Sequence, residues 1–160
     1  MRLKGADVPA VEACVALGAN LGDAQATVRA AIEDVASLPH TQRVLVSSLY
    51  RSAPFQAQGP DFINAVMLVR TTLAPLALLH ALQALEKLAG RQRPYINAPR
   101  TLDLDLILYG NDEISTPELT VPHPRYHQRA FVLHPLAEIA PQRVPSAWLQ
   151  AVADQPIQRL

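Results

Sequence analysis

Two aspartates stand two positions apart in the segment RTLDLDLILYG, residues 100–110. The alternating pattern predicts a β-strand with Asp103 and Asp105 on one face and the even-numbered leucines from 102 to 108 on the other. Neighbouring residues on one face start about 7 Å apart, so both carboxylates can reach one ligand. Like charges at such positions repel, and aspartate is unfavourable in strands. A divalent cation would offset both costs, and magnesium commonly binds through one or two carboxylates together with substrate phosphates.

Basic side chains lie on both sides of this aspartate strand in the sequence. They are Arg91, Arg93 and Arg100 before it, and His123, Arg125, His127 and Arg129 after it. Arginines that face a metal-binding carboxylate pair are expected around a polyphosphate, because phosphoryl transfer depends on positioning and charge neutralisation. The alternative is a solvated polar loop whose arginines pair with acidic side chains. Residue types and spacing leave both interpretations open.

Other candidate residues are individually ambiguous. Asn64 follows Phe62 at the start of an expected strand, where an amide can bind the edge of a planar heterocycle while an aromatic ring stacks on it. An ordinary strand end is the alternative. Gln83 and Glu86 are three apart and share one helical face, which by default is exposed surface. Phe131 is by default a core residue.

The first half of the chain predicts a strand, a helix and a hairpin. Residues 12–20 form the strand, and the turn GANLGD (18–23) lacks the glycine patterns of phosphate-binding loops. Asp23 is expected to cap a helix. The apolar face of that helix would be Val28, Ala31, Ile32, Val35 and Leu38. Residues 43–51 and 63–70 each alternate and predict an antiparallel hairpin with a long connection.

The second half adds a helix, the aspartate strand and further helices. Pro75 opens the helix and Gly90 ends it. Its inward residues would be Leu78, Leu79, Leu82, Leu85 and Leu88. Residues 128–139 look helical despite Pro135, and Ser146 could cap a last short helix. The element order predicts an α+β fold of the ferredoxin-like (split βαβ) kind: an antiparallel sheet with helices on one face and extra C-terminal helices.

Composition restricts the classes of function. The chain has 160 residues and a mass of 17.4 kDa, the size of one domain spanning 1–160. Its formal net charge is zero, which argues against nucleic acid or an anionic membrane as partner. Cys14 is the single cysteine, so no internal disulfide or thiolate metal site can form. No apolar run approaches the ~20 residues of a membrane span. We expect a cytoplasmic monomer that acts on small molecules.

Five segments together resemble the 6-hydroxymethyl-7,8-dihydropterin pyrophosphokinase family. They are GANLGD (18–23), SSLYRSAPF (47–55), DFINAV (61–66), APRTLDLDLILYG (98–110) and LTVPHPRYHQRAFVLHPLAEIAP (119–141). The resemblance runs from about residue 13 to 141, nearly the whole chain. It implies an enzyme of folate biosynthesis that moves the β,γ-pyrophosphoryl group of ATP onto the hydroxymethyl oxygen of a reduced pterin and releases AMP.

The same resemblance implies roles for individual residues. Asp103 and Asp105 would hold two Mg²⁺ ions and, with Arg91 and Arg100, form the catalytic set. The residues around ATP would be Gln83, Glu86, Arg91, Arg93, Arg100, Leu106, Thr120, His123 and Arg129. The residues around the pterin would be Ser52, Ala53, Phe55, Phe62, Asn64 and Phe131. This chain has Asn97-Ala98 where many members have Trp-Gly.

Two other classes of protein remain as alternatives. Polymerase-like nucleotidyl transferases also place two aspartates on a ferredoxin-like sheet and use two metals. The neutral net charge argues against their nucleic-acid substrate. A non-catalytic ferredoxin-like module that binds a small ligand would leave the two aspartates unexplained.

Overall fold

The computed structural model describes residues 9–54, 59–90 and 102–160. In chain order the elements are β1 (Val11–Ala19), α1 (Ala24–Ala36), β2 (Thr41–Val46), β3 (Tyr50–Ser52), β4 (Phe62–Thr71), α2 (Pro75–Gly90), β5 (Asp103–Tyr109), β6 (Ile114–Ser115), β7 (Thr120–Val121), the 3₁₀ turn η2 (Tyr126–Gln128), α3 (Ala130–Ile139), the 3₁₀ turn η3 (Pro141–Arg143), α4 (Ser146–Ala151) and β8 (Ile157–Arg159). None of the helices in these ranges is long and apolar enough to cross a membrane.

One six-stranded sheet organises the fold. Its strand order is β5-β1-β4-β3-β8, and β2 pairs with β4 ahead of β3. Each of its pairings among the described residues is antiparallel. The predicted α+β class with an antiparallel sheet is confirmed. Strands β6 and β7 form a separate two-stranded hairpin.

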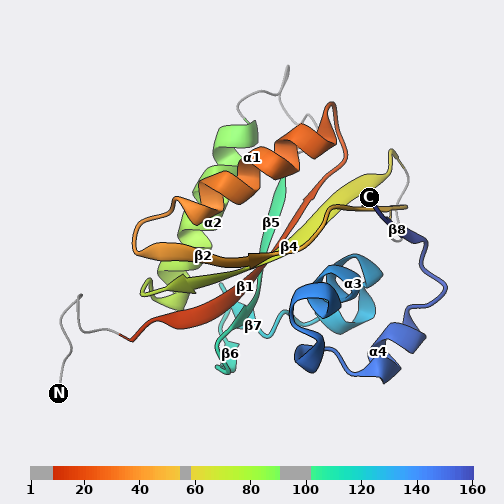
Figure 1. The fold of residues 1–160 in the computed structure, drawn as a ribbon. Helices are drawn as coiled ribbons and strands as arrows, with labels where there is room; N and C mark the ends of the chain where they lie inside the picture. The colour runs from red at the N-terminus through yellow and green to blue at the C-terminus, as the bar shows by residue number, and fades with distance from the viewer. Residues whose placement is uncertain (1–8, 55–58, 91–101) are drawn as a thin grey trace.

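Helices cover both faces of the sheet (Figure 1). Helices α1 and α2 lie on one face, and the C-terminal helices α3 and α4 lie on the other. The alternation along β1 explains this, because Val15 and Leu17 pack toward α1 and α2 while Cys14 and Ala16 pack toward α3. Cys14 is buried, and burial raises its pKa to about 12.

A β-bulge in β5 overturns part of the predicted alternation. Val15 pairs with Leu106 and Cys14 pairs with Leu108, so Ile107 is an extra residue. Leu108 therefore joins the core beneath α3 instead of sharing a face with the earlier leucines. The carbonyl of Ile107 accepts a hydrogen bond from the backbone N–H of His123 at 2.9 Å. The two aspartates precede the bulge and keep a common face.

Other element predictions also need correction. Ser146 does not cap α4, because Pro145 occupies the N-cap position and no side chain there makes a capping hydrogen bond. The single strand expected over 43–51 is divided into β2 and β3. The side-chain Oγ of Ser47 accepts the N–H of Val66, in the place where a backbone carbonyl would accept it if the strand continued. Leu88 was predicted to face inward but is 53% exposed. The helix expected from residue 128 begins at Ala130, after the turn η2, and it includes Pro135.

Glu138 of α3 makes hydrogen bonds with Ser48, between β2 and β3, and with Tyr50 in β3. Its carboxylate accepts hydrogen bonds from the N–H and Oγ of Ser48 (3.0 and 3.1 Å) and from Tyr50 Oη (2.7 Å), and Arg159 Nη2 lies at 3.4 Å. Burial raises the pKa of Glu138, but the hydrogen bonds from Tyr50 and Ser48 and the charge of Arg159 outweigh burial. The net effect is a pKa below the ordinary value of 4.5.

We expect Glu138→Gln to lower the free energy of unfolding by about 2 kcal/mol at pH 7, because charge-assisted hydrogen bonds are lost. A depressed folded-state pKa stabilises the protein above the unfolded-state value, and this stabilisation disappears as pH falls through the folded-state pKa. The difference from wild type should therefore shrink below pH 4.5. Urea denaturation at a series of pH values measures it, with exposed Glu113→Gln as control. A difference that grows on acidification would contradict this account.

Candidate active site

The register of three strands sets two rows of residues side by side on the α3 face. Gly18 of β1 pairs with Asp103 of β5 and with Asn64 of β4. One step along the same face, Ala16 pairs with Asp105 and with Val66. Because glycine has no side chain, the carboxylate of Asp103 and the amide of Asn64 border the same space across the backbone of β1.

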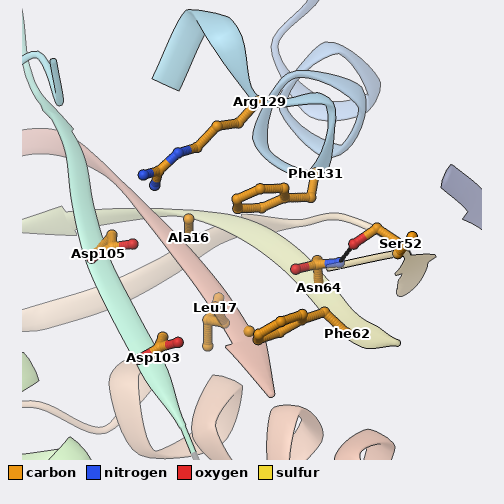
Figure 2. A pocket seen from close by; sticks show the side chains of 11 residues that line it. Ala16, Leu17, Ser52, Phe62, Asn64, Asp103, Asp105, Arg129 and Phe131 are labelled. Atoms are coloured by element: carbon orange, nitrogen blue, oxygen red, sulfur yellow. Dashed lines mark hydrogen bonds between the residues drawn. The ribbon is translucent and has the colours of Figure 1, made fainter. Parts of the chain in front are cut away.

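A pocket of about 220 Å³ lies between these rows and the start of α3. Its lining residues are Ala16, Leu17, Gly18, Ser52, Ala53, Phe62, Asn64, Asp103, Asp105, Arg129 and Phe131. Figure 2 shows Phe131 and Phe62 on opposite sides of the pocket with Asn64 between them, while Asp103 and Asp105 lie along another wall. The pocket therefore joins an aromatic slot to a charged end.

Asn64 is held in a fixed orientation at the end of the aromatic slot. It is 3% exposed, and its Nδ2 donates to Ser52 Oγ at 2.8 Å. One N–H of Nδ2 is donated to Ser52, which fixes the amide, and Oδ1 is the atom that can accept an N–H from a ligand. Strand β3 supplies Ser52 because it pairs with β4 next to Phe62.

Arg129 is the residue that precedes α3, and its side chain extends into the pocket (Figure 2). Its guanidinium carbon lies 5.6 Å from the centroid of the Phe131 ring. Its buried Nε has no hydrogen-bond partner within the described part of the chain. An unpaired buried donor is costly, and an anionic oxygen in the pocket would satisfy it.

Asp105, Arg129 and Arg125 lie close enough to His123 to shift its pKa. Burial lowers this pKa, Asp105 acts to raise it, and Arg129 and Arg125 lower it further, with a net lowering. His123 Nδ1 accepts the backbone N–H of Arg125 at 3.2 Å. In the neutral ring the proton is then on Nε2, which makes Nε2 a hydrogen-bond donor.

The residues expected around ATP are only partly gathered in this pocket. Glu86 is not simple exposed surface, because its Oε2 accepts the N–H of Leu104 on the edge strand β5 at 2.8 Å. Gln83 is exposed one helical turn earlier, and Thr120 is exposed in β7. The Leu106 side chain is buried in the core toward α1 and α2, on the face opposite the pocket. Leu106 could contact a ligand only through its backbone.

Four predicted site residues lie outside the described residues. They are Phe55, Arg91, Arg93 and Arg100, and the Asn97-Ala98 pair lies there too. Their roles remain predictions.

The donor set of the pocket fits magnesium. No group of three or more His, Cys, Asp or Glu side chains placed to hold a metal ion occurs among the residues that the structure describes. Zinc sites ordinarily need three or four such ligands. Magnesium binds through one or two carboxylates and keeps waters or substrate phosphates in its other positions. Asp103 and Asp105, lining one pocket from the same strand face, supply that set.

Sequence reasoning missed three residues of the pocket lining, Ala16, Leu17 and Gly18. Of these, Gly18 is the one that lies against Asn64. Its only sequence signal was a place in the GANLGD turn, whereas its importance depends on the register that sets it between Asp103 and Asn64. A Cβ added at Gly18 would lie 3.3 Å from Asn64 Oδ1. That contact is tight, and Asn64 is tied to Ser52 and cannot move freely.

We expect Gly18→Ala to weaken binding of a ligand in the aromatic slot by roughly five- to tenfold, about 1–1.4 kcal/mol, because the methyl group crowds Asn64 Oδ1 and the ligand group that bonds to it. The melting temperature should change little, since the pocket is open above the strand. Isothermal titration with a pterin, the ligand that the sequence resemblance implies, measures the affinity. Exposed Ala30→Gly on α1 is the control for affinity, because it lies outside the pocket lining and costs only helix propensity, about 1 kcal/mol. Unchanged affinity in Gly18→Ala would contradict the assigned role of Asn64.

Comparison with known proteins agrees with this geometry. Residues 14–141 match the family model described as 7,8-dihydro-6-hydroxymethylpterin-pyrophosphokinase. The chain belongs to this pyrophosphokinase family. It is 48% identical over 133 residues to the 2-amino-4-hydroxy-6-hydroxymethyldihydropteridine pyrophosphokinase of Pseudomonas aeruginosa, covering 82% of each chain. It is 44% identical over 131 residues to the enzyme of the same name from Haemophilus influenzae, covering 81% of this chain and 82% of that one.

Solved structures of the family share the fold. A structure described as HPPK-DHPS in complex with substrates superposes with a TM-score of 0.69 at 12% identity. That match covers 91% of this chain and 43% of the other, so the chain spans less than half of that protein. A Plasmodium falciparum HPPK-DHPS structure gives a TM-score of 0.65, also at 12% identity, and covers 88% of this chain and 44% of the other. At this identity the likeness supports the fold alone.

Proposed function

We propose that this chain transfers the β,γ-pyrophosphoryl group of ATP to the hydroxymethyl oxygen of 6-hydroxymethyl-7,8-dihydropterin and releases AMP in folate biosynthesis. The observation that carries the proposal is one pocket in which an aromatic slot with a fixed amide meets a carboxylate pair and Arg129. The family model and the names of the two bacterial relatives support the same reaction.

The pterin ring would lie between Phe62 and Phe131. Planar heterocycles stack on aromatic side chains, and buried polar groups then select the ring by its edge. Asn64 Oδ1 would accept an N–H from the pterin, while Ser52 holds the amide and Ala53 borders the slot. Phe55 would complete this part of the site. The hydroxymethyl group would then point toward Asp103 and Asp105.

Asp103 and Asp105 would hold magnesium, and we propose two ions on this pair. When bound, the ions would neutralise charge on the ATP phosphates and lower the pKa of the pterin hydroxyl. Gln83, Glu86, Thr120 and the backbone of Leu106 would border the nucleotide along the β5 edge. Leu106 is in β5, the strand that carries both carboxylates, Glu86 is bonded to it, and the elements of Gln83 and Thr120 (α2 and β7) contact it.

The chemical step would be an in-line displacement at the β-phosphorus. The pterin oxygen forms the new bond to that phosphorus, and the bond from the same phosphorus to the oxygen bridging it to the α-phosphorus breaks. AMP leaves with the bridging oxygen, and the hydroxyl proton passes to solvent. Arg129, His123 Nε2 and the predicted Arg91, Arg93 and Arg100 would donate to the phosphate oxygens, which carry more charge in the transition state.

The topology of the sheet, the oligomeric state and the cellular location are part of the same proposal. The order β5-β1-β4 followed by β2 and β3 supports a ferredoxin-like split βαβ arrangement with α1 and α2 as its two crossover helices. We also propose that the protein is a cytoplasmic monomer whose partners are ATP and the pterin, with no nucleic-acid or membrane ligand. The formal net charge of zero supports the last point.

Incubation with ATP, Mg²⁺ and the pterin, followed by chromatographic quantification of nucleotides, tests the activity. We expect AMP and a pterin diphosphate in equal amounts, and no AMP when the pterin is omitted. Formation of ADP would indicate a simple kinase, and release of inorganic pyrophosphate would indicate a nucleotidyl transferase. Absence of pterin-dependent ATP consumption would indicate a non-catalytic binding module.

A further inference from the structure

Gln155 lies between α4 and β8, beyond the residues 14–141 that match the family model. Its side-chain amide makes two hydrogen bonds. Oε1 accepts the backbone N–H of Ala130 at 2.9 Å, and Nε2 donates to the backbone carbonyl of Gln128 at 2.9 Å. Gln155 is therefore bonded to both residues that flank Arg129.

These two bonds restrain the backbone of Arg129. The Gln128 carbonyl belongs to the peptide group before its Cα, and the Ala130 N–H belongs to the peptide group after it. Arg129 is extended, with φ −123° and ψ 111°, and has no side-chain capping bond of its own to α3. By bonding both peptide groups, one planar amide limits rotation at the two backbone bonds that aim the arginine side chain. It also satisfies a donor at the start of α3.

The backbone of Gln155 is itself attached to the other side of the pocket. Two residues later, Ile157 pairs with Ser52 in the β8–β3 ladder. Ser52 accepts the hydrogen bond that orients Asn64. The segment from Gln155 to Ile157 thus joins the strand that orients Asn64 to the turn that presents Arg129.

We propose that Gln155 is a positioning residue, which holds Arg129 in the orientation that binds the ATP phosphates. The proposal rests on the proposed function, since Arg129 must contact the nucleotide. Gln155 itself does not line the pocket that holds Arg129, so its effect passes through the backbone of residues 128–130. Helix capping alone would stabilise the protein without any preference for Arg129, and the test must separate these two effects.

A double-mutant cycle between Gln155→Met and Arg129→Ala separates them. Methionine keeps the length of glutamine and removes both hydrogen bonds. We expect Q155M to lower kcat/KM for ATP by about tenfold, since small errors in the position of a charge-neutralising group are costly in rate. In the Arg129→Ala background, where no guanidinium remains to be oriented, Q155M should change kcat/KM by less than about twofold. Equal factors in both backgrounds would overturn the proposal.

Two further measurements complete the test. Q158M is the matched control, because Gln158 is exposed in the same segment and its side chain makes no hydrogen bond that the structure records among the described residues. Identical kinetics for Q155M and Q158M would also overturn the proposal. If Q155M is insoluble, Q155E replaces it, because Glu keeps the acceptor for Ala130 and loses the donor to Gln128. The same non-additivity is then expected.

The same cycle, measured as the affinity for the Mg²⁺ complex of α,β-methylene-ATP, does not depend on turnover. Non-additive affinities would support the proposal even if wild type formed no AMP, in which case the proposed function alone would fail. If wild type forms AMP but Q155M and Arg129→Ala are additive in both rate and affinity, the function stands and the positioning role fails.

Discussion

Asp105→Asn should lose at least about 10³-fold in kcat, the order expected when a group that organises transition-state charge is removed. Asparagine keeps the shape of the side chain but removes the negative charge that binds magnesium. Asp105 lies before the β5 bulge and is paired across the sheet with Ala16, so the strand does not need the charge to form. The fold should therefore survive.

The stability of Asp105→Asn provides an independent check of the metal assignment. Without magnesium, the substitution removes repulsion between two carboxylates on one strand face, so its melting temperature should equal or exceed that of wild type. Magnesium with α,β-methylene-ATP should stabilise wild type through binding to the native state and should stabilise the variant much less. Exposed Asp112→Asn is the matched control. Near wild-type turnover in Asp105→Asn would show that the metal assignment is wrong.

Arg129→Ala should lower kcat/KM for ATP by roughly 10²-fold, comparable to the loss of one preorganised charge-stabilising donor. Its buried Nε lacks a protein partner among the described residues, which is expected of a donor reserved for a ligand. Arg129→Lys keeps the positive charge but loses the planar array of donors, so it should recover only part of the activity. Steady-state kinetics with ATP varied at saturating pterin measures both.

The control for Arg129 is Arg29→Ala, because Arg29 is exposed on α1 and its side chain has no recorded hydrogen bond among the described residues. It should retain wild-type kinetics. If Arg129→Ala and Arg29→Ala behaved alike, the Arg129 guanidinium would have no part in binding the phosphates.

Local patterns were sufficient to predict much of the fold. The helix that Asp23 caps and the helix that Pro75 opens both form where the sequence places them, because capping and hydrophobic periodicity act over a few residues. The common face of Asp103 and Asp105 also follows from the strand period alone. The α+β class and the antiparallel sheet follow from the order of these elements.

Features that depend on contacts between distant segments could not be predicted in this way. The two-residue period of a strand does not reveal an inserted residue. The sequence therefore predicted neither the bulge at Ile107 nor the change of face at Leu108. Gly18 matters only because the register sets it between Asp103 and Asn64. Gln155 has no local motif, and its role depends on a hydrogen bond to a residue 25 positions earlier.

The most direct test of the central claim follows the oxygen that bridges the α- and β-phosphorus atoms of ATP. ATP labelled with ¹⁸O at that bridge is converted with the pterin and Mg²⁺, and the products are examined by phosphorus NMR for the isotope shift. Attack at the β-phosphorus predicts that all of the bridging label is found in AMP and that the pterin diphosphate carries none. Label in inorganic pyrophosphate, which attack at the α-phosphorus would give, or ADP as the labelled nucleotide, would contradict pyrophosphoryl transfer by this site.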